Sequence, residues 1–63
     1  MPIAQIQILE GRTAEQIETM IADVTQAIAR NMNAPVESVR VLVAEVPKTH
    51  WGIGGKTAKQ LGR

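Results

Sequence analysis

The sequence predicts an α+β domain built from a single β-α-β unit with parallel strands and a C-terminal hairpin. Two segments rich in aliphatic and β-branched residues, 3–9 and 39–46, have the length of strands. Between them, residues 14–32 repeat apolar side chains with the period of an amphipathic helix. Two strands joined by such a helix pair in parallel with a right-handed crossover. We expect residues 1–63 to form one domain.

Successive side chains of the first strand are expected to point to opposite faces of the sheet. One face carries Ala4, Ile6 and Ile8, and the other carries Ile3, Gln5, Gln7 and Leu9. After a short turn at 10–12, Thr13 has the features of a helix N-cap, and Gln16 completes a capping box. Glu15 and Glu18 complement the dipole of the helix.

The helix, the second strand and the hairpin follow from periodicity and from chain-breaking residues. The apolar stripe of the helix comprises Ile17, Met20, Ile21, Val24, Ala27, Ile28 and Met32. Asn33-Ala34-Pro35 ends the helix, because a residue before proline is disfavoured in the α region. The second strand is largely apolar on both faces, which is typical of a strand covered on two sides, and Pro47 ends it. The glycine-dense segment 52–55 predicts the turn of a hairpin.

Composition narrows the classes of protein to which this chain can belong. In 63 residues with no Cys and one His, neither disulfides nor a metal-ligand spacing can support so small a core. With 44% hydrophobic residues, the chain is expected to complete its core by oligomerisation. The net charge of +1 is scattered, which argues against nucleic acid as a partner. No segment has the pattern of a signal peptide or a membrane span, so we expect a cytoplasmic protein with no membrane partner.

Pro2 offers the most useful chemistry in the chain. Removal of Met1 would expose a prolyl secondary amine, and α-amino groups have a reference pKa of about 7.7–8.0. Desolvation or nearby cations would lower that pKa towards the range of a general base at neutral pH. If Met1 is retained, the prolyl nitrogen is an amide and has no basic lone pair.

Arg12, Arg40 and Trp51 are the candidate binding residues. Arg12 follows the first strand, and Arg40 lies near the start of the second strand on an otherwise apolar face. A planar guanidinium is well suited to bind a carboxylate of a ligand. The alternative is that the arginines pair with carboxylates of the chain: Glu10, Glu37 or Glu45. Trp51, the only aromatic residue, either packs in the core or forms the wall of a pocket.

Several segments in order resemble the 4-oxalocrotonate tautomerase family, the short-chain members of the tautomerase superfamily. The resemblance extends from Pro2 nearly to the C-terminus. Its most specific segments are Pro2-Ile3-Ala4-Gln5-Ile6, Ile8-Leu9-Glu10-Gly11-Arg12, Ala34-Pro35, Ser38-Val39-Arg40-Val41 and Gly52-Ile53-Gly54-Gly55. The resemblance implies a tautomerase-like β-α-β subunit that assembles as a homohexamer, a trimer of dimers, with sites across subunit boundaries.

The resemblance also implies a cofactor-independent isomerase of aromatic hydrocarbon catabolism. Its substrate would be a small unsaturated 2-hydroxy or 2-oxo dicarboxylate. Pro2 matches the amino-terminal proline that serves the family as general base. Arg12 matches the arginine that holds the distal carboxylate, and Arg40 matches the arginine at the 2-hydroxy or 2-oxo end. Trp51 stands where the family usually has phenylalanine, which changes the volume of the pocket.

Two alternative functions remain open. Relatives with this fold hydrate or dehalogenate halo-acrylates, with a protonated proline as the acid, but no residue near Pro2 in sequence is a clear water-activating carboxylate. A non-catalytic assembly module is the alternative if Met1 is retained. The sequence departs from the family pattern at Gln7, where a histidine is frequent, and at Pro47 and Lys56 near the hairpin.

Overall fold

Four strands, one α-helix and two 3₁₀ turns make up the computed structural model, which describes residues 1–63 throughout. In chain order the elements are β1 (Ile3–Leu9), α1 (Ala14–Met32), η1 (Val36–Ser38), β2 (Arg40–Val46), η2 (Lys48–His50), β3 (Gly52–Ile53) and β4 (Lys56–Thr57). β1 and β2 pair in parallel, from Ile3 opposite Arg40 to Leu9 opposite Val46, and β3 pairs with β4 in antiparallel orientation. The predicted β-α-β unit and C-terminal hairpin are confirmed.

The second strand begins one residue later than the sequence predicts. Val39 closes the η1 turn, because its N–H donates to the carbonyl of Val36 at 3.1 Å. The bond holds Val39 out of the ladder with β1, although its side chain is buried. The difference is local and leaves the alternation of the strand unchanged.

Side-chain and backbone caps set both ends of α1. Thr13 and Gln16 form the predicted capping box: the Gln16 N–H donates to Thr13 Oγ1 at 3.1 Å, and the Thr13 N–H donates to Gln16 Oε1 at 3.0 Å. At the other end Asn33 is left-handed, with φ of 52°, and Ala34 donates to the carbonyl of Ala29 at 3.0 Å. Helices commonly end in such a left-handed residue. No helix of this chain has the length and apolar character that crossing a membrane requires.

The hairpin turns at Gly54 and Gly55, whose φ angles are 60° and 89°. Two consecutive residues with positive φ are what a tight type I′ hairpin turn requires, and glycine adopts them without strain. A second capping box follows the hairpin, in which Thr57 and Gln60 exchange backbone-to-side-chain hydrogen bonds of 3.1 and 2.8 Å. Ala58, inside this terminal turn, has no exposed surface.

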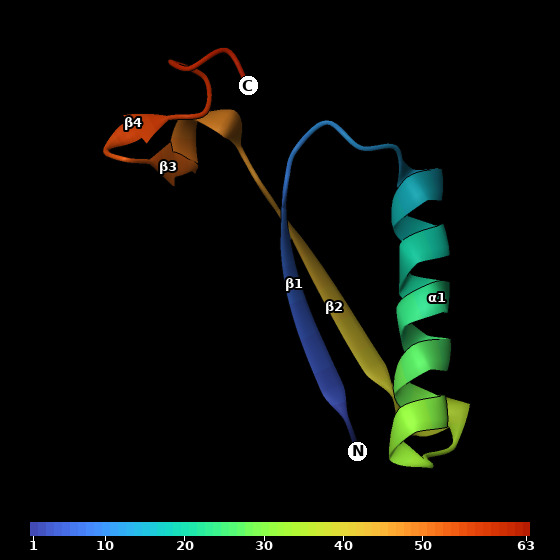
Figure 1. Cartoon of the computed structure of the whole chain (residues 1–63). Helices are drawn as coiled ribbons and strands as arrows, with labels where there is room; N and C mark the ends of the chain where they lie inside the picture. The colour runs from blue at the N-terminus through green and yellow to red at the C-terminus, as the bar shows by residue number, and fades with distance from the viewer.

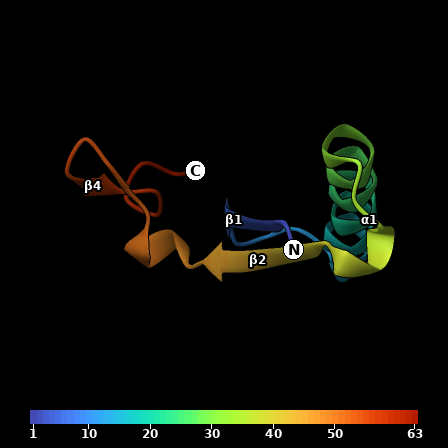
Figure 2. The same ribbon diagram turned by 90° about the horizontal axis from the view of Figure 1, so that it is seen from below.

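The chain is elongated, and the hairpin stands apart from the β-α-β unit. Figure 1 shows α1 alongside the two long strands, with β3 and β4 beyond their far end, and Figure 2 shows the same separation from below. The chain measures 43 × 23 × 13 Å, with a radius of gyration of 14.6 Å. A compact domain of this length would have a radius of about 11 Å. The hairpin is therefore an arm that does not fold back onto the body.

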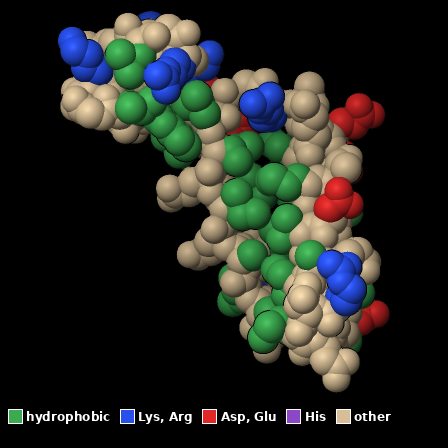
Figure 3. Space-filling model, viewed as in Figure 1, with side chains coloured by type: hydrophobic (Ala, Val, Ile, Leu, Met, Phe, Trp, Pro, Cys, Tyr) green, Lys and Arg blue, Asp and Glu red, His purple; other side chains and the backbone are tan.

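Little of the apolar surface is buried within one chain. Only Ala29, Val39 and Ala58 are buried, of 63 residues. Figure 3 shows hydrophobic side chains in a band between the strands and α1, with acidic side chains along the outer side of the helix. The sheet face that α1 does not cover carries the side chains of Ile3 and Leu42, which are 61% and 51% exposed. Met32, assigned to the buried stripe from its spacing, is also exposed, because it is the last helical residue and the chain turns away after it.

The capping box at Thr13 is expected to stabilise the folded chain measurably. Thr13→Ala removes the acceptor for the Gln16 N–H and should lower the free energy of unfolding by about 1 kcal/mol, whereas Thr13→Ser keeps a hydroxyl and should lose far less. Denaturant unfolding at one fixed protein concentration measures the difference, because subunit association also affects stability. Equal stability of the Ala and Ser variants would contradict the assigned role.

Candidate active site

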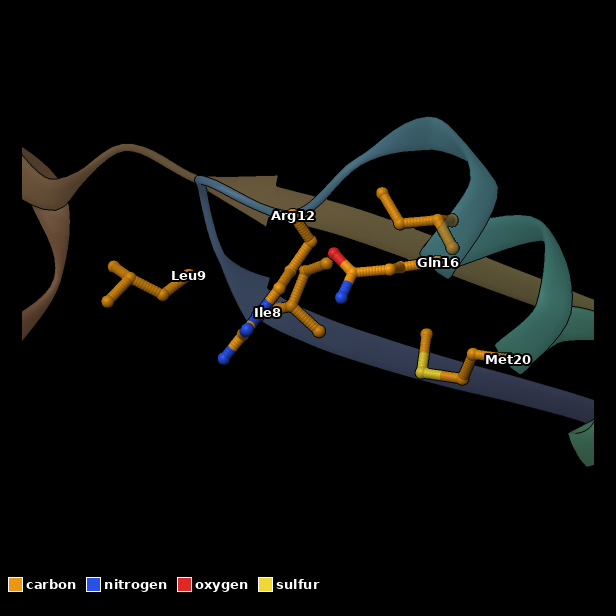
Figure 4. Close-up of a pocket in the computed structure, with 6 residues that line it drawn as sticks. Ile8, Leu9, Arg12, Gln16 and Met20 are labelled. Carbon is orange, nitrogen blue, oxygen red and sulfur yellow. The ribbon is translucent and has the colours of Figure 1, made fainter.

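Arg12 lies in the segment between β1 and α1, and two cavities border it. The larger, of about 380 Å³, is lined by Ile8, Leu9, Arg12, Gln16, Ile17 and Met20. Figure 4 shows the amide of Gln16 extending towards the Arg12 side chain across this cavity. Gln16 Oε1 already accepts the Thr13 N–H, so its amide NH₂ group is left to donate. The cavity is thus apolar along β1 and α1, with hydrogen-bond donors at the end where Arg12 lies.

The smaller cavity, of about 260 Å³, is more polar. It is lined by Leu9, Glu10, Gly11, Arg12, Lys48 and Arg63. Gly11 has φ of 120°, a conformation that side-chain-bearing residues rarely adopt, and it lets the chain turn away from β1 just before Arg12. Arg12 therefore projects where the two cavities adjoin.

Pro2 and Arg40 lie together at the opposite end of the sheet. The Arg40 N–H donates to the carbonyl of Pro2 at 3.0 Å, since β1 and β2 pair from their first residues. Arg40 Nη1 donates to the carbonyl of Glu37 at 2.7 Å and to that of Val39 at 3.3 Å. Arg40 thus meets Glu37 through its backbone and not through the carboxylate that the ion-pair interpretation requires. Its remaining N–H groups are left to bind an anion.

Trp51 belongs to the Arg12 end of the chain. Glu10 joins the two segments: its N–H donates to the carbonyl of Val46 at 3.0 Å, and its Oε1 accepts the N–H of Lys48 at 3.0 Å. Trp51 follows the η2 turn that begins at Lys48, and its carbonyl accepts the N–H of Ala58 at 2.8 Å. The indole is half-buried, so it is neither a core residue nor fully in solvent.

One chain therefore holds the candidate residues in two separate groups. Pro2 and Arg40 lie at the start of the parallel strands, whereas Arg12 and Trp51 follow their ends. The seven residue steps from Pro2 to Leu9 span roughly 23 Å of extended chain. No small dicarboxylate can bridge that distance. The residues of both groups can act on one ligand only if different copies of the chain supply them.

The structure also brings residues to the Arg12 end that the sequence did not single out for a site. Glu10, Lys48 and Arg63 border the same cavity as Arg12, although they lie far apart in sequence. No spacing rule links three such positions. The terminal turn that brings Arg63 back did have a sequence signal, the Thr57–Gln60 capping box, which resembles the one at the start of α1.

Comparison with known proteins places the whole chain among related enzymes. The family model described as tautomerase enzyme matches residues 2–60. A 2-hydroxymuconate tautomerase of Stutzerimonas stutzeri is 60% identical over 63 residues, all of both chains, and one of Pseudomonas putida is 56% identical over the same length.

Solved structures agree in fold. A structure of 4-oxalocrotonate tautomerase isozymes from Methylibium petroleiphilum is 55% identical with a TM-score of 0.93, covering 98% of this chain and 100% of that one. A heterohexamer 4-oxalocrotonate tautomerase from Chloroflexus aurantiacus J-10-fl is 36% identical with a TM-score of 0.91, covering 97% of this chain and 98% of that one. The predicted tautomerase fold is confirmed.

Proposed function

This chain belongs to the tautomerase family of isomerases, and we propose that its substrate is a small unsaturated 2-hydroxy or 2-oxo dicarboxylate such as 2-hydroxymuconate. The identity of about 60% to a 2-hydroxymuconate tautomerase over the full chain supports this substrate class. The observation that carries the proposal is the grouping of site residues at two ends of one sheet. Each end presents an arginine with free N–H groups, which matches a substrate with a carboxylate at each end.

Pro2 is the general base in this proposal. Once Met1 is removed, the secondary amine takes the proton of the 2-hydroxyl group and returns a proton to a carbon of the dienolate. Substrate and product therefore contain the same atoms, and the reaction is an isomerisation. Pro2 is half-buried, and its carbonyl accepts the backbone N–H of Arg40. Partial desolvation favours the neutral amine that a base must be, and a guanidinium brought near the amine in the assembled site would act in the same direction.

The two arginines stabilise the charge that develops during proton transfer. Arg40 binds at the 2-hydroxy or 2-oxo end, beside Pro2, and Arg12 binds the distal carboxylate. A guanidinium that faces the dienolate interacts more strongly as negative charge spreads towards it, and this difference lowers the barrier. Trp51 supplies an apolar wall at the Arg12 end, where water would otherwise weaken these interactions.

The complete site forms between copies of the chain, in a homohexamer arranged as a trimer of dimers. The exposed sheet face and the arm-like hairpin are surfaces that further copies would cover. Assembly also explains how Pro2 of one copy meets Arg12 of another, which a single chain keeps roughly 23 Å apart.

Mixed oligomers test the shared site directly. With a dicarboxylate substrate, Pro2→Ala chains should be nearly inactive alone, and Arg12→Ala chains should keep only about a tenth to a hundredth of the activity. When they are co-expressed or refolded together, about one site in four should combine an intact Pro2 with an intact Arg12 from another copy. Activity of the mixture, measured against each variant alone, should rise accordingly. A mixture no more active than its components, despite confirmed exchange of subunits, would show that both residues act within one chain.

The prolyl amine should control the low-pH side of the activity. Pro2→Ala is expected to lower kcat/KM by about 10²- to 10⁴-fold, the usual contribution of a general base. The acidic limb of the pH–rate profile should move in this variant, because a primary amine replaces the secondary amine. Intact mass must first show that Met1 is absent. As a control, a form that retains Met1 has an amide at Pro2 and should be inactive; full activity in that form would exclude the proline base.

The two arginines should differ in which substrates they affect. Arg12→Ala should lower kcat/KM for a dicarboxylate by about tenfold to hundredfold, the loss of one charge-assisted contact of about 1.5–3 kcal/mol, and should affect a monocarboxylate far less. Arg40→Ala should weaken both, because the 2-hydroxy end is common to them. Steady-state kinetics with both substrates, and size-exclusion chromatography of both variants, make the comparison. Equal losses for Arg12→Ala on both substrates, or loss of assembly, would indicate a structural role.

A further inference from the structure

Three cations from distant parts of the chain surround the smaller cavity beside Arg12. Arg12 comes from the connection between β1 and α1, Lys48 opens the η2 turn, and Arg63 is the last residue. The cavity of about 260 Å³ is polar, since Leu9 is the one hydrophobic side chain in its lining. The proposed mechanism uses only Arg12 of these three.

Hydrogen bonds from backbone N–H groups hold the segments of Lys48 and Arg63 near Glu10, which lies two residues before Arg12. The Lys48 N–H donates to Glu10 Oε1 at 3.0 Å, and the Lys48 carbonyl accepts the Lys59 N–H at 3.1 Å. The Arg63 N–H donates to the carbonyl of Ala58 at 2.9 Å, which returns the end of the chain towards η2. These bonds involve neither the ammonium group of Lys48 nor the guanidinium group of Arg63, so both cationic groups remain free to bind a ligand.

The charge around the cavity favours an anion. Glu10 is the one carboxylate side chain in the lining, and one of its oxygens is engaged by the Lys48 N–H. Three cationic side chains stand against this one carboxylate side chain. Two guanidinium groups and an ammonium group offer many more N–H donors than the carboxylate of Glu10 can accept.

We propose that Lys48 and Arg63 complete, with Arg12, an anion subsite that receives the distal carboxylate of the substrate and sets the preference for dicarboxylates. The proposal rests on the proposed function, which places that carboxylate at Arg12. The cavity is larger than one carboxylate and open to water, and Arg63 is exposed, so Lys48 and Arg63 act through partly screened interactions. They strengthen binding of substrate and transition state alike, which changes KM more than kcat.

Charge-removing variants with matched controls test the subsite. Lys48→Ala and Arg63→Ala leave the backbone hydrogen bonds in place. Lys56→Ala and Lys59→Ala remove the same charge from the same C-terminal arm but do not line the cavity. For each, kcat and KM are measured at low ionic strength with 2-hydroxymuconate and with a 2-hydroxy-dienoate that lacks the distal carboxylate. Inhibition by inorganic phosphate reports on a free anion.

The expected result is a change in specificity confined to the lining residues. The ratio of kcat/KM for the dicarboxylate to that for the monocarboxylate should fall about threefold to tenfold in each lining variant, through KM, and further in the double variant. Phosphate inhibition should weaken in parallel, and the Lys56 and Lys59 variants should keep the ratio of the unsubstituted protein. Weaker phosphate inhibition with an unchanged ratio would mean that the cavity binds free anions but not the substrate, which overturns the proposal.

The outcomes separate this subsite from the proposed function. If Lys48→Ala and Arg63→Ala resemble the controls while Arg12→Ala still impairs dicarboxylates selectively, the subsite is wrong and the proposed function stands. If the losses fall equally on both substrates, the cations act through general electrostatic attraction, and the subsite is again wrong. If Arg12→Ala itself shows no selectivity, the proposed function fails at its own step.

Discussion

One chain cannot bury its own apolar surface, and the rest of the structure depends on this constraint. A sheet with only β1 and β2 has a single helix to cover it, and only three residues become buried. Exposed hydrophobic residues such as Ile3 and Leu42 remain on the uncovered sheet face, and the hairpin extends as an arm. A chain of 63 residues with no disulfide is too short to cover that surface with its own residues. In the proposed hexamer, further copies of the chain cover this surface.

The parallel pairing of β1 and β2 decides where the candidate site residues lie. Parallel strands start together and end together, so their first residues bring Pro2 beside Arg40, and their last residues lead to Arg12 and the segment of Trp51. Extended strands keep these two groups far apart within one chain. Association that covers the sheet can also bring the start of one copy near the end of another, so burial of apolar surface and formation of the site become one event.

Most side-chain hydrogen bonds of the chain join residues that are close in sequence. Eight of the nine side-chain hydrogen bonds join residues no more than four positions apart, mainly in caps and turns. The exception is the bond from the Lys48 N–H to Glu10, which spans 38 positions. It ties the arm that carries Trp51 to the turn that carries Arg12. The sequence suggests Glu10 as a possible partner for an arginine, whereas in the structure Glu10 bonds the carbonyl of Val46 and the N–H of Lys48.

The sequence by itself determined the elements and most of the candidate residues. The signals for these elements act within a few residues, so they can be recognised without knowledge of the fold. They are the hydrophobic periods of two residues in the strands and 3.6 residues in the helix, the Thr13–Gln16 capping box, the Asn33-Ala34-Pro35 helix end and the paired glycines of the hairpin. Pro2, Arg12 and Arg40 could be selected because a prolyl amine and unpaired guanidinium groups carry recognisable chemistry.

Only the tertiary structure decided which of these residues share an end of the sheet. The pairing of Ile3 with Arg40 fixes Pro2 beside Arg40. The side chain of Arg40 bonds backbone carbonyls and not the carboxylate of the alternative ion-pair interpretation, and Lys48 and Arg63 lie beside Arg12. Such contacts depend on strand register and on the path of the C-terminal turn. The register is set by hydrogen bonds between residues far apart in sequence, which no local pattern encodes. The bond from the Lys48 N–H to Glu10, across 38 positions, brings the C-terminal segment to the Arg12 end.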